Sequence, residues 1–151
     1  MNKGETKQIE TAELQSLKNL FDLPLHTPNA AIIFTFGTLY TKLRIDQKQF
    51  IYLHRILNRE NGNWTRKTLS TLEDMKIGWY KCIQENLADY QLPTDFSTIK
   101  NIAPNEWKFK VQDSIEKRNK ERLNAECLET TEGVTKEKTK TVSLLKHLTF
   151  N

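Results

Sequence analysis

Hydrophobic residues recur at intervals of three and four along most of the chain, which is the spacing of one buried helix face. The main stripes are Leu14, Leu17, Leu20 and Phe21, then Leu39, Leu43, Phe50, Leu53 and Leu57, then Leu69, Leu72, Met75, Trp79, Ile83, Leu87 and Tyr90, and finally Trp107, Val111 and Ile115. Strand-like alternation is scarce, and five glycines and four prolines are few for a turn-rich β fold. The pattern predicts an all-α protein, an irregular bundle of about five to seven helices with a polar linker near the C-terminus.

Residues that break or cap helices divide these stripes into separate elements. Helix ends or breaks are expected at Pro24, at Asn61-Gly62, at Gly78 and at Pro93, and Pro104 opens the last helix. Thr94 or Asp95 is placed to cap one short turn through Phe96 and Ile99. Between the first two stripes, Thr27-Pro28 is a helix-start signal and Gly37 a helix-end signal. Residues 32–36 also have the composition of a buried strand, but the cap and the terminal glycine favour a helix.

Composition divides the chain into three parts. Residues 1–9 are polar and are predicted to be a loose N-terminus, and residues 10–128 form the helical domain. Residues 129–151 begin with a Thr, Glu and Lys stretch that cannot bury itself. They end in a predicted terminal apolar helix with Leu144, Leu145, Leu148 and Phe150. An apolar segment after a charged linker suggests a piece of a larger protein.

Positive charge is concentrated around the second stripe. The whole chain carries a formal charge of +4, whereas residues 41–67 hold seven Lys/Arg against two Asp/Glu, which is +5. At 100° per residue, Arg44, Lys48, Arg55 and Arg59 fall together opposite the apolar stripe of residues 39–58. Such a row of cations can follow the phosphates of an RNA or DNA backbone and release counterions. The simpler interpretation is a solvated helix face.

Motifs for catalysis and for metal binding are missing from the sequence. It contains no phosphate-binding glycine-rich loop, no HExxH and no Gly-x-Ser-x-Gly turn. Cys82 and Cys127 lie far apart, and His54 borders an apolar helix face, where a packing role is expected. We therefore expect a chain that is not an enzyme, with no catalytic residue, no metal and no cofactor.

Hydropathy predicts no contact with a membrane. Apolar runs are too short to cross a bilayer, and residues 1–7 lack the apolar segment of a secretion signal. The expected location is intracellular, either cytoplasmic or nuclear.

Several short sequences together resemble one part of a known family. They are Leu23-Pro24, Thr27-Pro28-Asn29-Ala30-Ala31-Ile32, Phe36-Gly37 and Phe50-Ile51-Tyr52-Leu53-His54-Arg55-Ile56-Leu57-Asn58. This pattern resembles the region just after the reverse transcriptase domain of non-LTR (LINE-type) retrotransposon polyproteins. The likeness continues through Trp107-Lys108 and Lys138-Thr139-Lys140, and covers roughly residues 20–150.

The chain also departs from that family. The polymerase active site of the family uses paired aspartates that bind magnesium, whereas Ala88-Asp89-Tyr90 offers a single acid. The endonuclease signatures and the Cys/His knuckle of such polyproteins are missing. Thr35-Phe36-Gly37 stands where the family often has Glu-Leu-Gly. The parent protein that the resemblance implies would be an RNA-directed DNA polymerase, and its catalytic motif is not found in this chain.

The resemblance implies a helical linker or thumb-adjacent region that holds template RNA or target DNA beside the polymerase. Under that interpretation Arg44, Lys48, Arg55 and Arg59 contact the nucleic-acid backbone. Weaker candidates on the last helix are Lys108, Lys110, Lys117 and Arg118. Trp64, next to Arg66 and Lys67, is a candidate to stack on an unpaired base, although a core anchor or a cap contact is the simpler interpretation.

The sequence thus predicts a non-catalytic helical fragment of a retrotransposon polyprotein that assists RNA or DNA template binding. Its expected partners are the nucleic-acid backbone and a neighbouring polymerase domain or another protein chain. The alternative is a helical protein-interaction module whose terminal apolar stripes dock to another chain. A small enzyme of unrecognised type is a third possibility.

Overall fold

The chain is all-α. The structure, a computed structural model, describes the backbone of residues 3–148 and the side chains of residues 4–128. This part contains no strand and seven helices: α1 (Lys3–Leu20), α2 (Asn29–Thr35), α3 (Thr41–Leu57), α4 (Trp64–Met75), α5 (Trp79–Asp89), α6 (Phe96–Asn101) and α7 (Pro104–Leu148). The predicted fold class, an irregular helical bundle, is confirmed.

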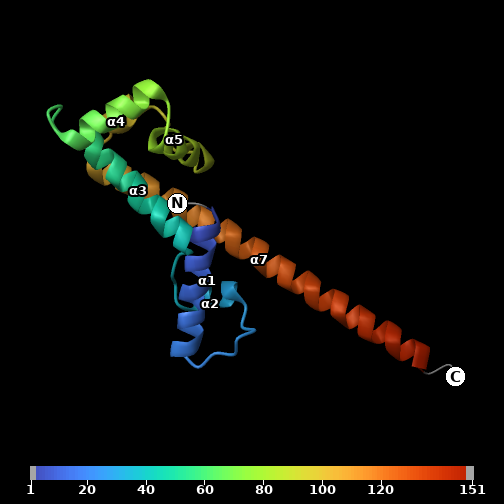
Figure 1. Cartoon of the computed structure of the whole chain (residues 1–151). Coiled ribbons are helices and arrows are strands. Elements are labelled where there is room, and N and C mark those ends of the chain that lie inside the picture. The colour runs from blue at the N-terminus through green and yellow to red at the C-terminus, as the bar shows by residue number, and fades with distance from the viewer. Residues whose placement is uncertain (1–2, 149–151) are drawn as a thin grey trace.

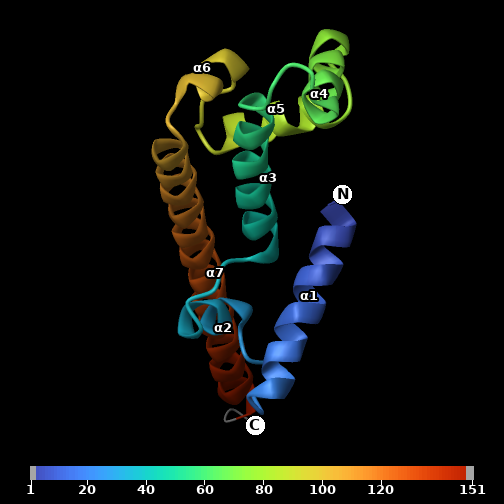
Figure 2. The same ribbon diagram turned by 90° about the vertical axis from the view of Figure 1, so that its left-hand side faces the viewer.

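Helix α3 is the centre of the bundle and packs against α1, α4, α5, α6 and α7. Figure 2 shows α2 and the end of α1 at one end of the molecule and α4, α5 and α6 at the other, with α3 and α7 running between them. Toward its C-terminus, α7 extends well past the other helices (Figure 1). The molecule is therefore elongated, with two separate ends.

The core forms where the apolar face of α3 meets α7. Phe50 and Leu53 of α3 and Val111 and Ile115 of α7 are fully buried. The indole N–H of Trp107 donates a hydrogen bond of 3.0 Å to the carbonyl oxygen of Phe50, which fixes the first turn of α7 on the middle of α3. Full burial of each such aliphatic or aromatic side chain contributes roughly 1.5–3 kcal/mol.

Two buried polar side chains of α3 find partners on other elements. Asp46 forms an ion pair with Lys42 one turn earlier and accepts a hydrogen bond of 2.6 Å from the Tyr90 hydroxyl. His54 is buried, and its Nε2 lies 2.9 Å from the Ile102 carbonyl oxygen. The carbonyl can only accept, so Nε2 carries the proton. The predicted packing role of His54 agrees with this position.

Most predicted helix boundaries agree with the structure. The turn at residues 61–62 separates α3 from α4. Gly78, with φ of +60°, separates α4 from α5, and Asp95 caps α6 by accepting 2.8 Å from the Thr98 amide. Residues 29–35 are helical, so the strand alternative is excluded. The helix starts at the expected Thr27-Pro28 signal, but Pro28 takes the cap position and no side chain caps the helix.

The predicted segment boundaries near both ends differ from the structure. Helix α1 begins at Lys3 and Thr6 is buried, so residues 3–9 do not form the predicted loose N-terminus. Helix α7 runs without a break through residues 129–140, where a linker was predicted. A helix already nucleated at Pro104 extends at little cost through Glu- and Lys-rich sequence. Residues 149–151 of the predicted terminal segment lie outside the described part.

Candidate functional site

The four predicted backbone contacts do not share one environment. Lys48 and Arg55 are exposed on the face of α3 that points away from the core, whereas Arg44 is half-buried. Arg59 lies beyond the end of α3, because the helix ends at Leu57. Only two residues of the predicted stripe, Lys48 and Arg55, are therefore exposed cations on the helix. Arg44 at one end and Arg59 at the other have different surroundings.

At one end of the stripe, Arg44 is compensated by an acid of α1. Its guanidinium pairs with the Glu13 carboxylate, which also accepts a hydrogen bond of 2.6 Å from the Thr41 hydroxyl. The Thr41 hydrogen bond, together with Arg44, outweighs partial burial and lowers the pKa of Glu13 below its ordinary value of 4.5. Arg44 thus helps to hold α1 on α3 and is a poor candidate for a phosphate contact.

At the other end, Arg59 is held by α4. Its Nη1 donates a hydrogen bond of 3.0 Å to the Thr65 hydroxyl oxygen. Thr65 itself lies in the first turn of α4, where the Asn63 side chain caps the helix by accepting 3.1 Å from the Thr65 amide. Arg59 keeps its charge exposed while this contact limits its freedom of motion.

Between α3 and α4 lies an apolar groove of about 350 Å³. Buried Ile56 and Leu69 line it together with the aromatic residues Tyr52, Trp64 and Trp79. The ring centroids of Tyr52 and Trp79 are 6.4 Å apart. The polar members of the lining are neutral, namely Gln49, Thr65 and Thr68. We refer to this surface as the aromatic groove.

Trp64 is not a core anchor, so this part of the prediction for it is wrong. Its side chain is 83% exposed at the first residue of α4. The Lys67 ammonium lies 5.9 Å from its ring centroid. The packing of α4 is carried instead by Leu69, which is buried.

Four cations lie next to residues that line the aromatic groove. Lys48 and Arg55 lie four residues before and three residues after Tyr52, so they are its neighbours on the surface of α3. Arg59 is fixed to Thr65, and Lys67 lies over Trp64. Within the described side chains none of these four cations has an ion pair.

Arg66 does not belong to this set. It is half-buried, and its Nη1 is enclosed without a hydrogen-bond partner among the described residues. The four cations that remain place exposed positive charge beside the aromatic rings of the groove.

The weaker candidates on α7 lie apart from this surface. They belong to α7 rather than to α3 or α4, and none of them lines the aromatic groove. Lys110 pairs with Glu106 at 2.8 Å and Arg118 pairs with Glu121 at 3.3 Å, whereas Lys108 and Lys117 are exposed. The structure therefore does not join these residues to Lys48 and Arg55.

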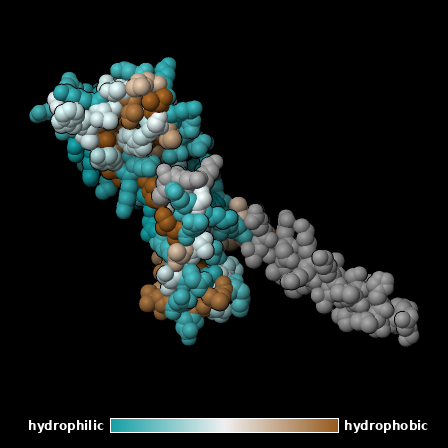
Figure 3. Space-filling view, viewed as in Figure 1, coloured by the Kyte–Doolittle hydropathy of each residue, from teal (hydrophilic) through white to brown (hydrophobic). Residues whose placement is uncertain are grey.

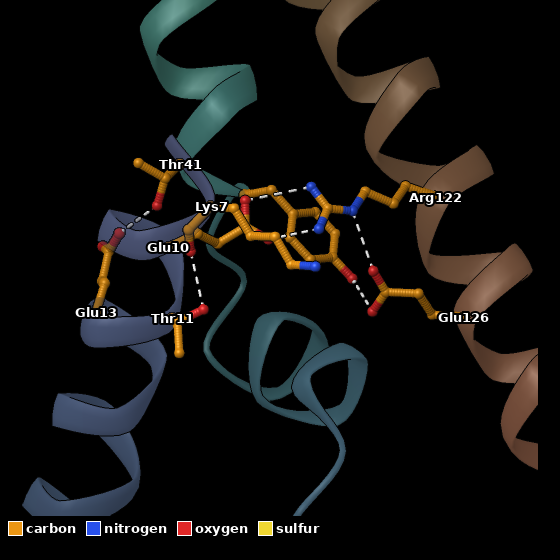
Figure 4. A network of polar contacts seen from close by, with 8 residues as sticks. Lys7, Glu10, Thr11, Glu13, Thr41, Arg122 and Glu126 are labelled. Atoms are coloured by element: carbon orange, nitrogen blue, oxygen red, sulfur yellow. Dashed lines mark hydrogen bonds and ion pairs between the residues drawn. The ribbon is translucent and has the colours of Figure 1, made fainter. Parts of the chain in front are cut away.

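A second polar cluster joins α1 to α7 beside a cavity of about 810 Å³ (Figure 4). Arg122 pairs with Glu10, donates 3.0 Å to Glu126 and lies 3.5 Å over the Tyr40 ring. Tyr40 donates 2.7 Å to Glu126, and burial together with this bond raises its pKa. Burial alone would lower the pKa of Arg122, but its two carboxylate partners outweigh that effect. The charges and hydrogen-bonding groups of this cluster are thus paired with one another, and the Arg122–Glu10 ion pair links α7 to α1.

Exposed apolar side chains gather at the end of the molecule that contains α2. They are Leu20, Phe21, Leu25, Phe34 and Phe36. The rings of Phe21 and Phe36 lie 4.4 Å apart between centroids, and Phe34 is 79% exposed. Figure 3 shows hydrophobic residues on this lower end of the molecule. We refer to these residues as the apolar end.

Two other kinds of site are absent from the part of the chain that the structure describes. No three His, Cys, Asp or Glu side chains are grouped so as to hold a metal ion. No helix has both the length and the apolar character that a membrane span requires.

Comparison with known proteins adds no relative. No protein-family model, no curated protein and no solved structure matches the chain. Function must therefore be argued from the residues themselves.

Two aromatic residues of the groove were not predicted from the sequence. Tyr52 and Trp79 were not identified as functional, although Tyr52 falls between Lys48 and Arg55 on the polar face of its helix. An exposed aromatic residue inside a basic stripe was the available signal. No signal in the sequence could place Trp79 beside it, because α5 reaches α3 only through tertiary packing.

Proposed function

We propose that this chain is a non-catalytic helical fragment of a retrotransposon polyprotein and that it binds the sugar-phosphate backbone of RNA or DNA. The observation that carries the proposal is the set of four exposed cations beside the aromatic groove, Lys48, Arg55, Arg59 and Lys67, none of which forms an ion pair among the described side chains. The parentage rests on the sequence resemblance over roughly residues 20–150.

Charge accounting favours this surface over the other basic residues. Of the seven cations in residues 41–67, Lys42 and Arg44 are paired with carboxylates and Arg66 is half-buried. An exposed cation whose charge is not already compensated is the better candidate for a phosphate contact, because a salt-bridged cation must share its charge with, or leave, its carboxylate partner. The remaining four meet this condition.

A salt titration tests the proposal. With about four phosphate contacts, the logarithm of the binding constant for single strands should fall with log salt at a slope of about −2.8. Between about 50 and 200 mM salt the affinity should fall roughly 50-fold. Fluorescence anisotropy of labelled RNA and DNA oligonucleotides, single-stranded and duplex, measures this slope directly.

A pair of matched charge reversals locates the contact. Lys48→Glu, Arg55→Glu and Arg59→Glu together change the formal net charge from +4 by three steps of two, to −2. Lys108→Glu, Lys117→Glu and Lys120→Glu on α7 make the same change in net charge. We expect the first variant to lose most of the affinity and the salt slope, and the second to retain the larger part. Affinity independent of salt, or equal losses in the two variants, would contradict the proposal.

The apolar end supports a second candidate function, a protein-interaction module. Five large apolar side chains at the end of α1 and around α2 remain exposed, and contiguous exposed apolar patches mark interaction surfaces. Sedimentation at several concentrations tests self-association through this patch, and Phe34→Asp should abolish any association seen. A single monomeric species at every concentration would count against self-association.

A further inference from the structure

The aromatic groove has a property that backbone binding alone does not use. Beside the cations it carries two exposed aromatic rings, those of Tyr52 and Trp64. We propose that Trp64 and Tyr52 stack on an unpaired nucleobase, so that the nucleic acid bound here is single-stranded. This inference rests on the proposed function, because the four cations supply the backbone contacts.

Trp64 is the residue that the fold leaves without a structural role. At 83% exposure it contributes little to the core, and α4 is capped by Asn63 rather than by the indole. Its position is nevertheless defined, since it begins α4 and lies 5.9 Å from the Lys67 ammonium. A large ring held in solvent beside a cation is suited to stacking on a planar ligand.

The groove beside Trp64 is apolar and matches the flat face of a base. Ile56, Leu69 and Leu72 line it together with Tyr52 and Trp79. Its volume of about 350 Å³ is at the small end of ordinary ligand pockets, which run from about 300 to 1,000 Å³. Bases inside a duplex have both faces covered by their neighbours, so only an unpaired base can enter.

Charge complementarity identifies the ligand as an anionic strand. Arg59 is bonded to Thr65 on the lining, and Lys48 and Arg55 flank Tyr52 by helical spacing. No acidic side chain lines the groove. A neutral apolar protein segment would use the rings and leave the cations unused, whereas single-stranded RNA or DNA uses both.

Removing one ring tests the inference. Trp64→Leu in the full chain removes the stacking face and keeps all four cations, and Phe109→Leu removes another exposed aromatic ring, on α7. The probes are a uridine or thymidine 15-mer and a duplex hairpin of equal charge. We expect Trp64→Leu to weaken single-strand binding about five- to hundredfold, with the salt slope unchanged and duplex binding unaffected. Phe109→Leu should bind both probes as the wild type does, and Trp64→Phe should recover part of the affinity.

Fluorescence provides a second measurement. Stacking on Trp64 should quench tryptophan emission when the single strand is added, and this quenching should be lost in Trp64→Leu. Far-UV circular dichroism of each variant shows that the helices are intact.

The outcomes separate this inference from the proposed function. No salt-dependent binding of either probe would contradict the proposed function itself. Salt-dependent binding that is equal for single strand and duplex, or equal in Trp64→Leu and Phe109→Leu, would keep the proposed function and overturn the stacking. If Trp64→Leu leaves oligonucleotide binding intact and abolishes association with a second protein chain, the groove is a protein site, and the inference is wrong.

Discussion

Trp64 and Trp107 occupy opposite environments, so the same substitution at each should have very different effects. Trp107 is 1% exposed, donates 3.0 Å to the Phe50 carbonyl and stacks at 6.1 Å on the His54 ring. Trp107→Phe keeps an aromatic ring but removes the indole N–H and roughly two buried carbon groups. The prediction is that Trp107→Phe is clearly destabilising and that Trp64→Phe is nearly neutral.

The magnitude follows from these contacts. Two buried carbon groups contribute about 1.6 kcal/mol, and the lost hydrogen bond about 0.5–1.5 kcal/mol. The Phe50 carbonyl keeps the bond that helix geometry gives it, so no unsatisfied group is left. The total is about 2–3 kcal/mol for Trp107→Phe, against less than about 0.5 kcal/mol for the exposed Trp64.

Urea unfolding followed by far-UV circular dichroism measures the difference. With a slope of about 2 kcal/mol per molar urea, the midpoint should fall by about 1–1.5 M for Trp107→Phe. Equal midpoint shifts in the two variants, or a Trp107→Phe midpoint at the wild-type value, would refute the assigned burial. The slopes should stay equal, which shows that only stability has changed.

Three further predictions concern single positions. Tyr90→Phe removes the hydroxyl that donates to buried Asp46, and should cost about 1.5–3 kcal/mol in urea unfolding; an unchanged midpoint would contradict it. Gly78→Ala should lower the stability by about 1–3 kcal/mol, because φ is +60° at this residue. The control Gly62→Ala should be nearly neutral. Similar thermal midpoints for the two variants would contradict the positive φ at Gly78. Folding lowers the pKa of Glu13, so its stabilisation is present above pH 4.5 and is lost as pH falls through the lowered value. Glu13→Gln should therefore lower the urea midpoint at pH 7, and its difference from the wild type should shrink as the pH is lowered below 4.5. A difference that stays constant with pH would contradict the ion pair.

Many features of the fold could be predicted from the sequence, because helix boundaries depend on local chemistry. Gly78 requires a positive φ, Asp95 offers a carboxylate to a free amide, and Pro104 has no amide to donate. Each acts through its own backbone or the next few residues. The spacing of Trp107, Val111 and Ile115, four residues apart, likewise determined which face of α7 is buried, because spacing along a helix is itself a local property.

The candidate site could be predicted only in part. The basic residues of α3 and the turn after them could be identified from the sequence. Which of these cations are exposed and not paired with a carboxylate could not be. Arg44 is compensated by Glu13, which lies 31 residues away in sequence, and this pairing exists only once α1 has packed on α3. An ion pair between two elements depends on their relative position, which no local pattern contains.

Which apolar residues are buried also depended on the tertiary structure. Trp64 and Phe34 are as hydrophobic as Trp107, yet they are exposed and Trp107 is enclosed. The aromatic groove exists because α4 and α5 fold back on α3 and bring Trp64 and Trp79 to Tyr52. The sequence by itself determined most helix boundaries between residues 20 and 104 and which face of α3 is basic. Only packing decided which rings and charges remained in solvent, because burial depends on what another part of the chain covers.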